Sequence, residues 1–429
     1  MSKVIIIGGG AAGMMAGVFA ARDHHEVHIL EKNEKLGKKV FITGKGRCNV
    51  TNACDTEELF PAMMSNPKFL YSSFYSFTPQ DVMEFFEKAG VPLKVERGNR
   101  VFPQSDHSSD IIRALERELK KAGAKIHLHT AVQEIVKKPV TESVTDSVNT
   151  LESEAALTES GSDAGKSRKG KKSSDIQQEK ITGVILTDGT FIEGDAVIVA
   201  TGGFSYQSTG STGDGYRFAR ELGLKVTDIA PSLVPLKTKE DYIPKLQGLS
   251  LKNTGLTIKN GKKVLYEDFG EMMFTHFGVT GPMILSASAH IGAKLAKAPN
   301  GELSAYLDLK PALTREQLDA RILREFEAGP NKQFKNVIGV LFPSSLTPVM
   351  LELGGIPAEK KIHDISREER QHFVDLVKAF PFTITGMGEF KEAIITKGGV
   401  SVKEINPGTM ESKKSQDSTS QAKYWTWMQ

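Results

Sequence analysis

Three glycines near the start of the chain have the spacing of a dinucleotide-binding turn. Gly8, Gly10 and Gly13 follow the apolar residues 4–7 and lead into a run of small residues that suits a helix. The first glycine permits a tight turn, the second lets a pyrophosphate approach the backbone, and the third lets helix pack against strand. The free N–H groups and the positive dipole end of such a helix attract phosphate oxygens. These residues predict a phosphate-binding site between a buried strand and a helix.

Glu31 strengthens this prediction. It directly follows a second predicted strand, residues 26–30. An acidic side chain about twenty residues after the glycines binds the ribose diol of a dinucleotide. Lys32 follows Glu31 and is included in the predicted site. The same pattern also fits a glycine-rich strand–helix turn that binds no ligand.

A polar loop follows the second predicted strand. Residues 44–52 are dense in Gly, Asn and Thr, which suits a segment that turns sharply and exposes backbone N–H groups. Lys45 and Arg47 add positive charge. Because the loop follows a strand of the predicted sheet, we interpret it as part of the ligand site. A solvated surface loop is the alternative.

Other chemistries have less support in the sequence. Cys48 and Cys54 flank the polar loop and could form a redox pair, which requires α-carbons within about 7 Å of each other. We find no cysteine–histidine cluster with zinc spacing and no G-x-S-x-G nucleophile elbow. We therefore expect no metal, assign no catalytic residue, and expect His276 to be a core histidine.

The elements that must position these residues follow from hydrophobic patterns. Residues 195–199 form another apolar run, and we expect it to lie beside the first strand in a parallel sheet. This run leads to Thr201, Gly202 and Gly203, which would then lie near the cofactor. Residues 231–309 alternate as short strands do, and residues 311–380 have helical spacing. Strand character returns at residue 382.

One segment differs in kind. Residues 139–180 are rich in Ser, Thr, Glu and Lys and contain no aromatic residue. Such a composition cannot bury enough apolar surface to offset chain entropy. We predict a disordered insertion in a hairpin loop.

Composition limits the class of protein. The formal charge of +3 and a pI near 8.5 are mild and argue against nucleic acid or an anionic membrane as partner. The sequence contains no run of about 18 apolar residues, so we expect no membrane span. Two cysteines among 429 residues fit a reducing compartment, so we expect a cytoplasmic protein.

With these motifs in hand, the chain resembles the YhiN/BaiN-like family of bacterial NAD(P)/FAD-dependent oxidoreductases, which includes the aminoacetone oxidase family. The resemblance rests on the glycine motif at the start, Gly44-Lys-Gly-Arg-Cys-Asn-Val-Thr-Asn52, the loop 205–215, Phe274-Thr-His-Phe-Gly278 and Thr396-Lys-Gly-Gly-Val400. It implies an α/β fold: a Rossmann-type FAD-binding domain with an inserted β-barrel-like domain and a helical subdomain. The expected boundaries are 1–230 plus 382–429, 231–310 and 311–381.

The resemblance also implies FAD contacts. By match of motif, Ala12, Gly13, Glu31, Lys38 and Lys39 would contact FAD, and Arg47 to Asn49 would lie near the flavin. The complete predicted cofactor site is Gly8, Gly10, Ala12, Gly13, Glu31, Lys32, Lys38, Lys39, Gly44, Arg47, Cys48, Asn49, Thr201, Gly202 and Gly203.

The predicted function is an FAD-dependent oxidoreductase that acts on a small organic substrate, with NAD(P)H as a transient donor. By charge alone, Lys45 and Arg47 would stabilise an anionic reduced flavin. One alternative is a pyridine-nucleotide disulfide reductase using Cys48 and Cys54. Another is a catalytically impaired remnant, because residues 414–429 depart from the family's FAD-closing segment, which predicts weak FAD binding and an unpaired sheet edge. Neither the substrate nor the oligomeric state follows from the sequence.

Overall fold

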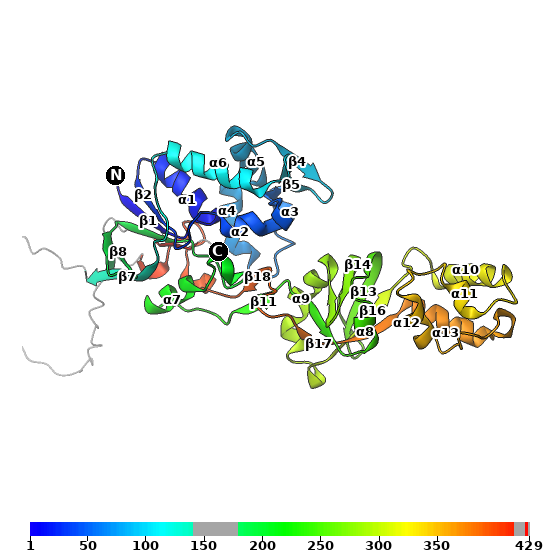
Figure 1. Ribbon diagram of the computed structural model, residues 1–429. Coiled ribbons are helices and arrows are strands. Elements are labelled where there is room, and N and C mark those ends of the chain that lie inside the picture. The colour runs from blue at the N-terminus through cyan, green and yellow to red at the C-terminus, as the bar shows by residue number, and fades with distance from the viewer. Residues whose placement is uncertain (140–178, 416–424, 428–429) are drawn as a thin grey trace, which may run out of the picture. The chain divides into compact units, whose positions relative to one another are not determined.

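The computed structural model, drawn in Figure 1, describes residues 1–139, 179–415 and 425–427. The described chain divides into two compact units. The first contains residues 1–36, 113–200 and 403–428, and the second contains residues 37–112 and 201–402. Most of the predicted disordered insertion and most of the departing tail lie outside the described residues. No helix in the described ranges is long and apolar enough to cross a membrane.

A five-stranded parallel sheet forms the centre of the first unit. Its strands, in spatial order, are β19 (Trp425–Trp427), β10 (Ala196–Val199), β1 (Lys3–Ile7), β2 (Glu26–Leu30) and β6 (Lys125–His127). Parallel sheets are covered on both faces, and the central strands β1 and β10 are accordingly almost entirely apolar. The predicted placement of residues 195–199 beside the first strand is confirmed.

Small residues bring two helices close to this sheet. Gly17 of α1 (Ala11–Arg22) leaves so little space that a Cβ there would lie 2.8 Å from side-chain atoms of both Ile29 and Leu119. Leu119 belongs to α6 (Ser108–Lys121). The glycine therefore lets α1 approach both its strand and its neighbouring helix.

The tail forms the edge of the sheet. β19 pairs in parallel with β10, with Val197 opposite Trp425 and Val199 opposite Trp427. The expected unpaired sheet edge is therefore wrong over these three positions. Backbone hydrogen bonds supply the pairing.

A second, antiparallel sheet of the first unit contains the flanks of the insertion. Its strands are β7 (Val132–Pro139), β8 (Glu179–Leu186) and β9 (Phe191–Glu193). Pro139 lies opposite Glu179, so the two ends of the insertion are joined by strand pairing, as the hairpin prediction required.

The N-terminal part of the second unit is a small sheet with short helices. Its sheet has the order β3 (Thr51–Asn52), β5 (Arg100–Pro103) and β4 (Leu93–Glu96). Its longest helix begins after Thr78, which forms a reciprocal capping box with Asp81. The helices are α2 (Lys38–Ile42), α3 (Thr56–Leu59), α4 (Tyr71–Ser76) and α5 (Pro79–Lys88), with 3-10 turns at Thr43–Gly46 and Pro67–Leu70.

The remainder of the second unit contains a closed six-stranded barrel. Its strands, in order around the barrel, are β12 (Leu236–Thr238), β15 (Gly278–Thr280), β14 (Lys263–Thr275), β13 (Ser250–Asn260), β16 (Leu303–Asp308) and β17 (Phe380–Met387). Residue 382, where we expected the chain to return to the first domain, lies inside β17. One helix, α9 (Pro282–Leu295), packs on the barrel, mainly against β14 (Figure 1).

Four helices between β16 and β17 form the helical region. They are α10 (Arg315–Glu327), α11 (Phe334–Ile338), α12 (Thr347–Leu353) and α13 (Arg367–Lys378), packed around the fully buried rings of Phe334 and Phe373. The remaining elements are α7 (Asp214–Glu221), β11 (Ala230–Ser232), α8 (Tyr242–Lys245) and β18 (Ile395–Lys397). The fold is therefore α/β: a Rossmann-type sheet, a closed barrel and a helical region, as predicted.

Candidate functional site

The glycine turn has the local geometry that the sequence predicts. Gly8 has φ +107°, and its N–H donates to Leu30 at 2.9 Å. A Cβ at Gly13 would lie 1.9 Å from the Gly8 carbonyl oxygen, so only glycine permits this contact between helix and strand. A Cβ at Gly10, in contrast, would meet no described atom within 4 Å. The turn is therefore tightly packed at Gly13 and open at Gly10.

The first turn of α1 contains no acidic residue. Its N-cap residue is Gly10, so no side chain at that position caps the turn. The N–H groups of this turn, including that of Ala12, have no intrahelical acceptors, and the helix dipole places partial positive charge there. An anion is the chemical partner that such an end favours.

Glu31 lies directly against this turn. Its side chain is buried, and Oε2 accepts a hydrogen bond from the Gly9 N–H at 2.7 Å. Oε1 accepts from the backbone and side-chain amides of Asn33 at 2.8 and 2.6 Å. A carboxylate can accept about four hydrogen bonds, and three are made here, so capacity remains for about one more, such as that of a ribose hydroxyl. Together with the open space at Gly10 and the end of α1, these residues fit a dinucleotide. Lys32 is the next residue along the chain.

In the second unit, Lys39 is held by neutral oxygens. Its Nζ donates to the carbonyl and hydroxyl oxygens of Ser205 at 3.0 and 2.8 Å. Burial lowers the pKa of Lys39. The Ser205 hydroxyl in turn donates to the Ile394 carbonyl at 3.2 Å. Lys38 begins the same helix, α2, after Gly37 in the left-handed conformation.

The glycines after β10 are required by packing. Gly202 has φ +72°, and a Cβ there would lie 2.9 Å from Ser211 Oγ. A Cβ at Gly203 would lie 2.8 Å from Thr396 Oγ1. The Thr396 hydroxyl also accepts the backbone N–H of Phe204 at 2.8 Å. These contacts explain both glycines without a ligand, unlike the open space at Gly10. Thr201 begins this segment, and its proposed cofactor contact stays a prediction.

The polar loop contains a run of left-handed residues. Gly44, Lys45, Gly46 and Cys48 have φ values of +57°, +60°, +85° and +59°. For the two non-glycine residues this conformation costs about 1–2 kcal/mol each. Non-glycine residues are held in such conformations most often at ligand-binding and catalytic sites.

Asn49 ties the end of this loop to the small sheet. With its amide oriented to satisfy its surroundings, the side-chain NH₂ donates to the carbonyls of Thr51 and Val101 at 3.0 and 3.1 Å. The backbone N–H of Cys48 donates to Thr43 at 3.1 Å across the loop. The loop is therefore anchored at both ends.

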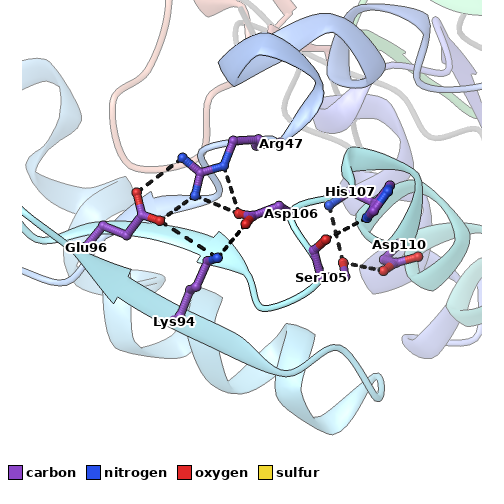
Figure 2. Close-up of polar contacts among 7 residues, drawn as sticks. All are labelled: Arg47, Lys94, Glu96, Ser105, Asp106, His107 and Asp110. Carbon is purple, nitrogen blue, oxygen red and sulfur yellow. Dashed lines mark hydrogen bonds and ion pairs between the residues drawn. The ribbon is translucent and has the colours of Figure 1, made fainter.

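Arg47 makes the strongest polar contacts of the loop (Figure 2). Its Nε donates to Asp106 Oδ1 at 2.8 Å, and its two terminal nitrogens pair with both oxygens of Glu96. The guanidinium also lies over the Phe102 ring, 4.2 Å from its centroid. Lys94 completes the group with a 2.6 Å ion pair to Asp106. We call Arg47, Lys94, Glu96 and Asp106 the Arg47 cluster.

The Arg47 cluster balances two positive against two negative charges. The hydrogen bond from Arg47 lowers the pKa of Glu96, and those from Lys94 and then Arg47 lower the pKa of Asp106. The same carboxylates raise the pKa of Arg47. Stabilisation of a reduced flavin by Arg47 through charge alone is therefore not supported by this geometry. Lys45 is exposed in the same loop.

The two cysteines are free thiols. Burial raises the pKa of Cys48, and burial and the nearby Glu58 raise that of Cys54. A raised pKa disfavours the reactive thiolate, so these features do not favour the disulfide reductase alternative. His276 is exposed at the turn between β14 and β15, so the expectation of a core histidine is wrong.

Sequence reasoning missed the partners of the predicted residues. Lys94 and Glu96 are two residues apart on a strand and so share one face, a signal that could have suggested a charged pair. Asp106, Ser205 and Thr396 carry no comparable local signal, because their partners are distant in the sequence.

The parallel sheet, the glycine turn and Glu31 together define a dinucleotide-binding protein. Residues 2–167 match the family model described as the HI0933-like protein Rossmann domain, and residues 230–395 match the HI0933-like protein barrel and H2TH domain. The chain belongs to this HI0933-like family of FAD-dependent oxidoreductases, which confirms the YhiN/BaiN-like resemblance.

Curated relatives span nearly the whole chain. The 3-dehydro-bile acid delta(4,6)-reductase of Clostridium scindens is 29% identical over 415 residues, covering 96% of this chain and 90% of that protein. The ribosomal RNA dihydrouridine synthase of Haemophilus influenzae is 27% identical over 418 residues, covering 96% and 89%. The Escherichia coli protein of the same name is 25% identical over 414 residues, covering 96% and 88%.

Proposed function

We propose that this protein uses FAD to reduce a carbon–carbon double bond conjugated to a carbonyl group in a small organic substrate. The observation that carries the cofactor assignment is the turn of α1, which is open at Gly10 and flanked by the buried carboxylate of Glu31. This arrangement suits a pyrophosphate and a ribose diol.

The substrate class is supported by what the relatives' names have in common. A delta(4,6)-reductase of a 3-dehydro-bile acid saturates carbon–carbon double bonds, and a dihydrouridine synthase saturates that of a uracil ring. In both substrates the double bond is conjugated to a carbonyl. The shared chemistry is therefore the reduction of an activated alkene.

Bound FAD would supply the two-electron redox chemistry, and the protein would supply binding, orientation and electrostatics. The first-turn N–H groups of α1, including that of Ala12, would bind the pyrophosphate, and Glu31 would accept a hydrogen bond from a ribose hydroxyl. Lys39 and the loop from Gly44 to Asn49 would contact the cofactor, as the family motif implies. NAD(P)H would act as a transient donor.

A small molecule is favoured over RNA by the charge of the barrel and helical region. Between residues 230 and 395, Lys and Arg barely outnumber Asp and Glu. Many of these cations are paired, for example Arg315 with Asp375 at 2.6 Å and Arg370 with Asp319 at 2.7 Å. RNA-binding surfaces generally carry a basic patch that neutralises phosphates.

The test is stepwise. The full chain is loaded with FAD and reduced anaerobically with NADPH, NADH or dithionite. Reoxidation of the flavin absorbance is then followed after addition of a 3-oxo-4,6-diene steroid, 2-cyclohexen-1-one, or a uridine-containing ribosomal RNA fragment. We expect the enones to reoxidise the flavin. Failure to bind FAD would overturn the proposal. Reoxidation of the flavin by the RNA fragment alone would show that the substrate is RNA and not a small enone.

A further inference from the structure

We propose that Glu96 and Asp106 are positioning residues that hold the loop of residues 43–48 in the conformation that contacts the flavin. The inference rests on the proposed function, because it assigns a purpose to residues around the same cofactor. Neither residue belongs to the predicted cofactor site, and both act through Arg47 (Figure 2).

The first observation is where the strain lies. Arg47 has φ −93° and is flanked by left-handed Gly46 and Cys48, with left-handed Lys45 one residue further back. A loop does not keep two left-handed non-glycine residues unless surrounding contacts hold it there. The side chain with the most extensive polar contacts in this run is that of Arg47, in the middle of it.

The second observation is that the anchors come from two other elements. Glu96 is the last residue of β4, and Asp106 lies in the turn that precedes α6. The planar guanidinium binds both carboxylates while lying over Phe102 of β5. A bidentate, stacked arginine restricts direction as well as distance. The loop is therefore cross-linked to a strand and a turn by a single side chain.

The third observation is that the turn carrying Asp106 is itself strained and braced. Asp106 has φ +60°. Its neighbour Ser105 donates through Oγ to Asp110 at 2.6 Å and accepts the His107 N–H at 3.2 Å (Figure 2). Left-handed residues thus carry or flank both sides of the Arg47–Asp106 contact, and both conformations serve to align its charges.

Fold stability alone does not explain this construction. The side chains of Arg47, Glu96 and Asp106 are 33%, 30% and 42% exposed, so water screens each ion pair, although a bidentate network retains more stabilisation than an isolated surface pair. The cluster is also electrically balanced, so it brings no net charge to an anionic cofactor. Precise placement of the loop is what the geometry supplies.

The test uses Glu96→Gln and Asp106→Asn in the full chain. Their matched control is Glu84→Gln, which breaks the exposed 3.1 Å pair between Glu84 and Lys88 in α5. FAD dissociation constants are measured by quenching of flavin fluorescence, together with the visible flavin spectrum and the unfolding temperature of the apoprotein. Hydrogen exchange of the amides in residues 44–48 reports on the loop without cofactor.

We expect each cluster variant to weaken FAD binding about tenfold, the equivalent of one lost hydrogen bond, to shift the flavin spectrum, and to speed loop exchange. The control should match the unmodified chain. Arg47→Lys keeps the positive charge but cannot form the bidentate contact of the guanidinium, so it should behave like the cluster variants.

Three results would overturn the inference. The first is an unchanged FAD affinity and flavin spectrum in both cluster variants. The second is a lower unfolding temperature without any change in FAD affinity, which would indicate a purely structural role. The third is an Arg47→Lys protein that binds FAD normally. Failure of the unmodified chain to bind FAD would instead overturn the proposed function, and this inference with it.

Discussion

The glycine turn of the first unit and the Gly44–Cys48 loop of the second are built in opposite ways. The turn depends on missing side chains: Gly13 lets α1 meet β1, and Gly10 leaves space. The loop depends on side chains that reach it from elsewhere, above all Glu96 and Asp106. A phosphate site can thus be made by local backbone sterics, whereas a left-handed loop needs partners distant in the sequence.

The largest expected effect comes from Gly13→Ala. Its Cβ would lie 1.9 Å from the Gly8 carbonyl oxygen, a backbone atom that cannot move away without separating α1 from β1. We expect a loss of about 3 kcal/mol or more of unfolding free energy. Gly10→Ala is the matched control, because the same added methyl group meets open space. Equal denaturation midpoints for the two variants would show that the turn is not packed as described.

Gly10→Val sharpens the comparison by separating folding from binding. Gly10 has φ −78°, which valine adopts without strain, so thermal unfolding of the apoprotein should change by only about 1–2 °C. FAD binding should fall by about a hundredfold or more, because the side chain fills the space proposed for the pyrophosphate. Full flavin occupancy in this variant would place the cofactor elsewhere.

Acid should weaken the loop. In the folded protein the pKa values of Glu96 and Asp106 lie below their ordinary values of 4.5 and 3.8. The stabilisation of the loop by these carboxylates is therefore fully present above the ordinary pKa values, and it is lost as pH falls through the lower pKa values of the folded protein. The difference in FAD affinity between the unmodified chain and Glu96→Gln should persist from pH 8 to about 5 and narrow below about 4. An undiminished difference at low pH would show that these charges do not hold the loop.

The smallest expected effect concerns pH and the sheet of the first unit. Burial lowers the pKa of His127, whose Nε2 lies 3.1 Å from His28 Nδ1. The charged side chains near these two histidines are Lys3, Lys125 and Glu26. Glu26 Oε1 lies within hydrogen-bonding distance of His28 Nε2, at 3.0 Å. Because the unfolded chain protonates first, stability should fall as pH decreases below about 6.5.

His127→Gln should remove part of that dependence. The matched control is His276→Gln, at an exposed position of the second unit. The measurement is the unfolding temperature of each protein between pH 7.5 and 5.5. An identical pH profile for His127→Gln and the unmodified chain would exclude this histidine as its source.

Much of the fold follows from local patterns. The strand at Lys3–Ile7 was expected because a continuous apolar run must be buried on both faces. The strand at Glu26–Leu30 was expected because a dinucleotide-binding unit has a second strand before its acidic residue. The return of residues 195–199 to the sheet was also expected. The strand that closes the barrel, β17, was instead assigned to the first domain, because barrel closure depends on which strands pair.

The sequence by itself determined the glycine turn and Glu31, because steric limits on the backbone and a fixed spacing along a strand–helix–strand unit act within about thirty residues. Only the tertiary structure decided the partners of Arg47, which lie 49 and 59 residues away, and the pairing of Trp425–Trp427 with β10. Such contacts depend on strand register and on the path of the chain. A charged residue does not reveal in the sequence whether it will meet a ligand or two carboxylates.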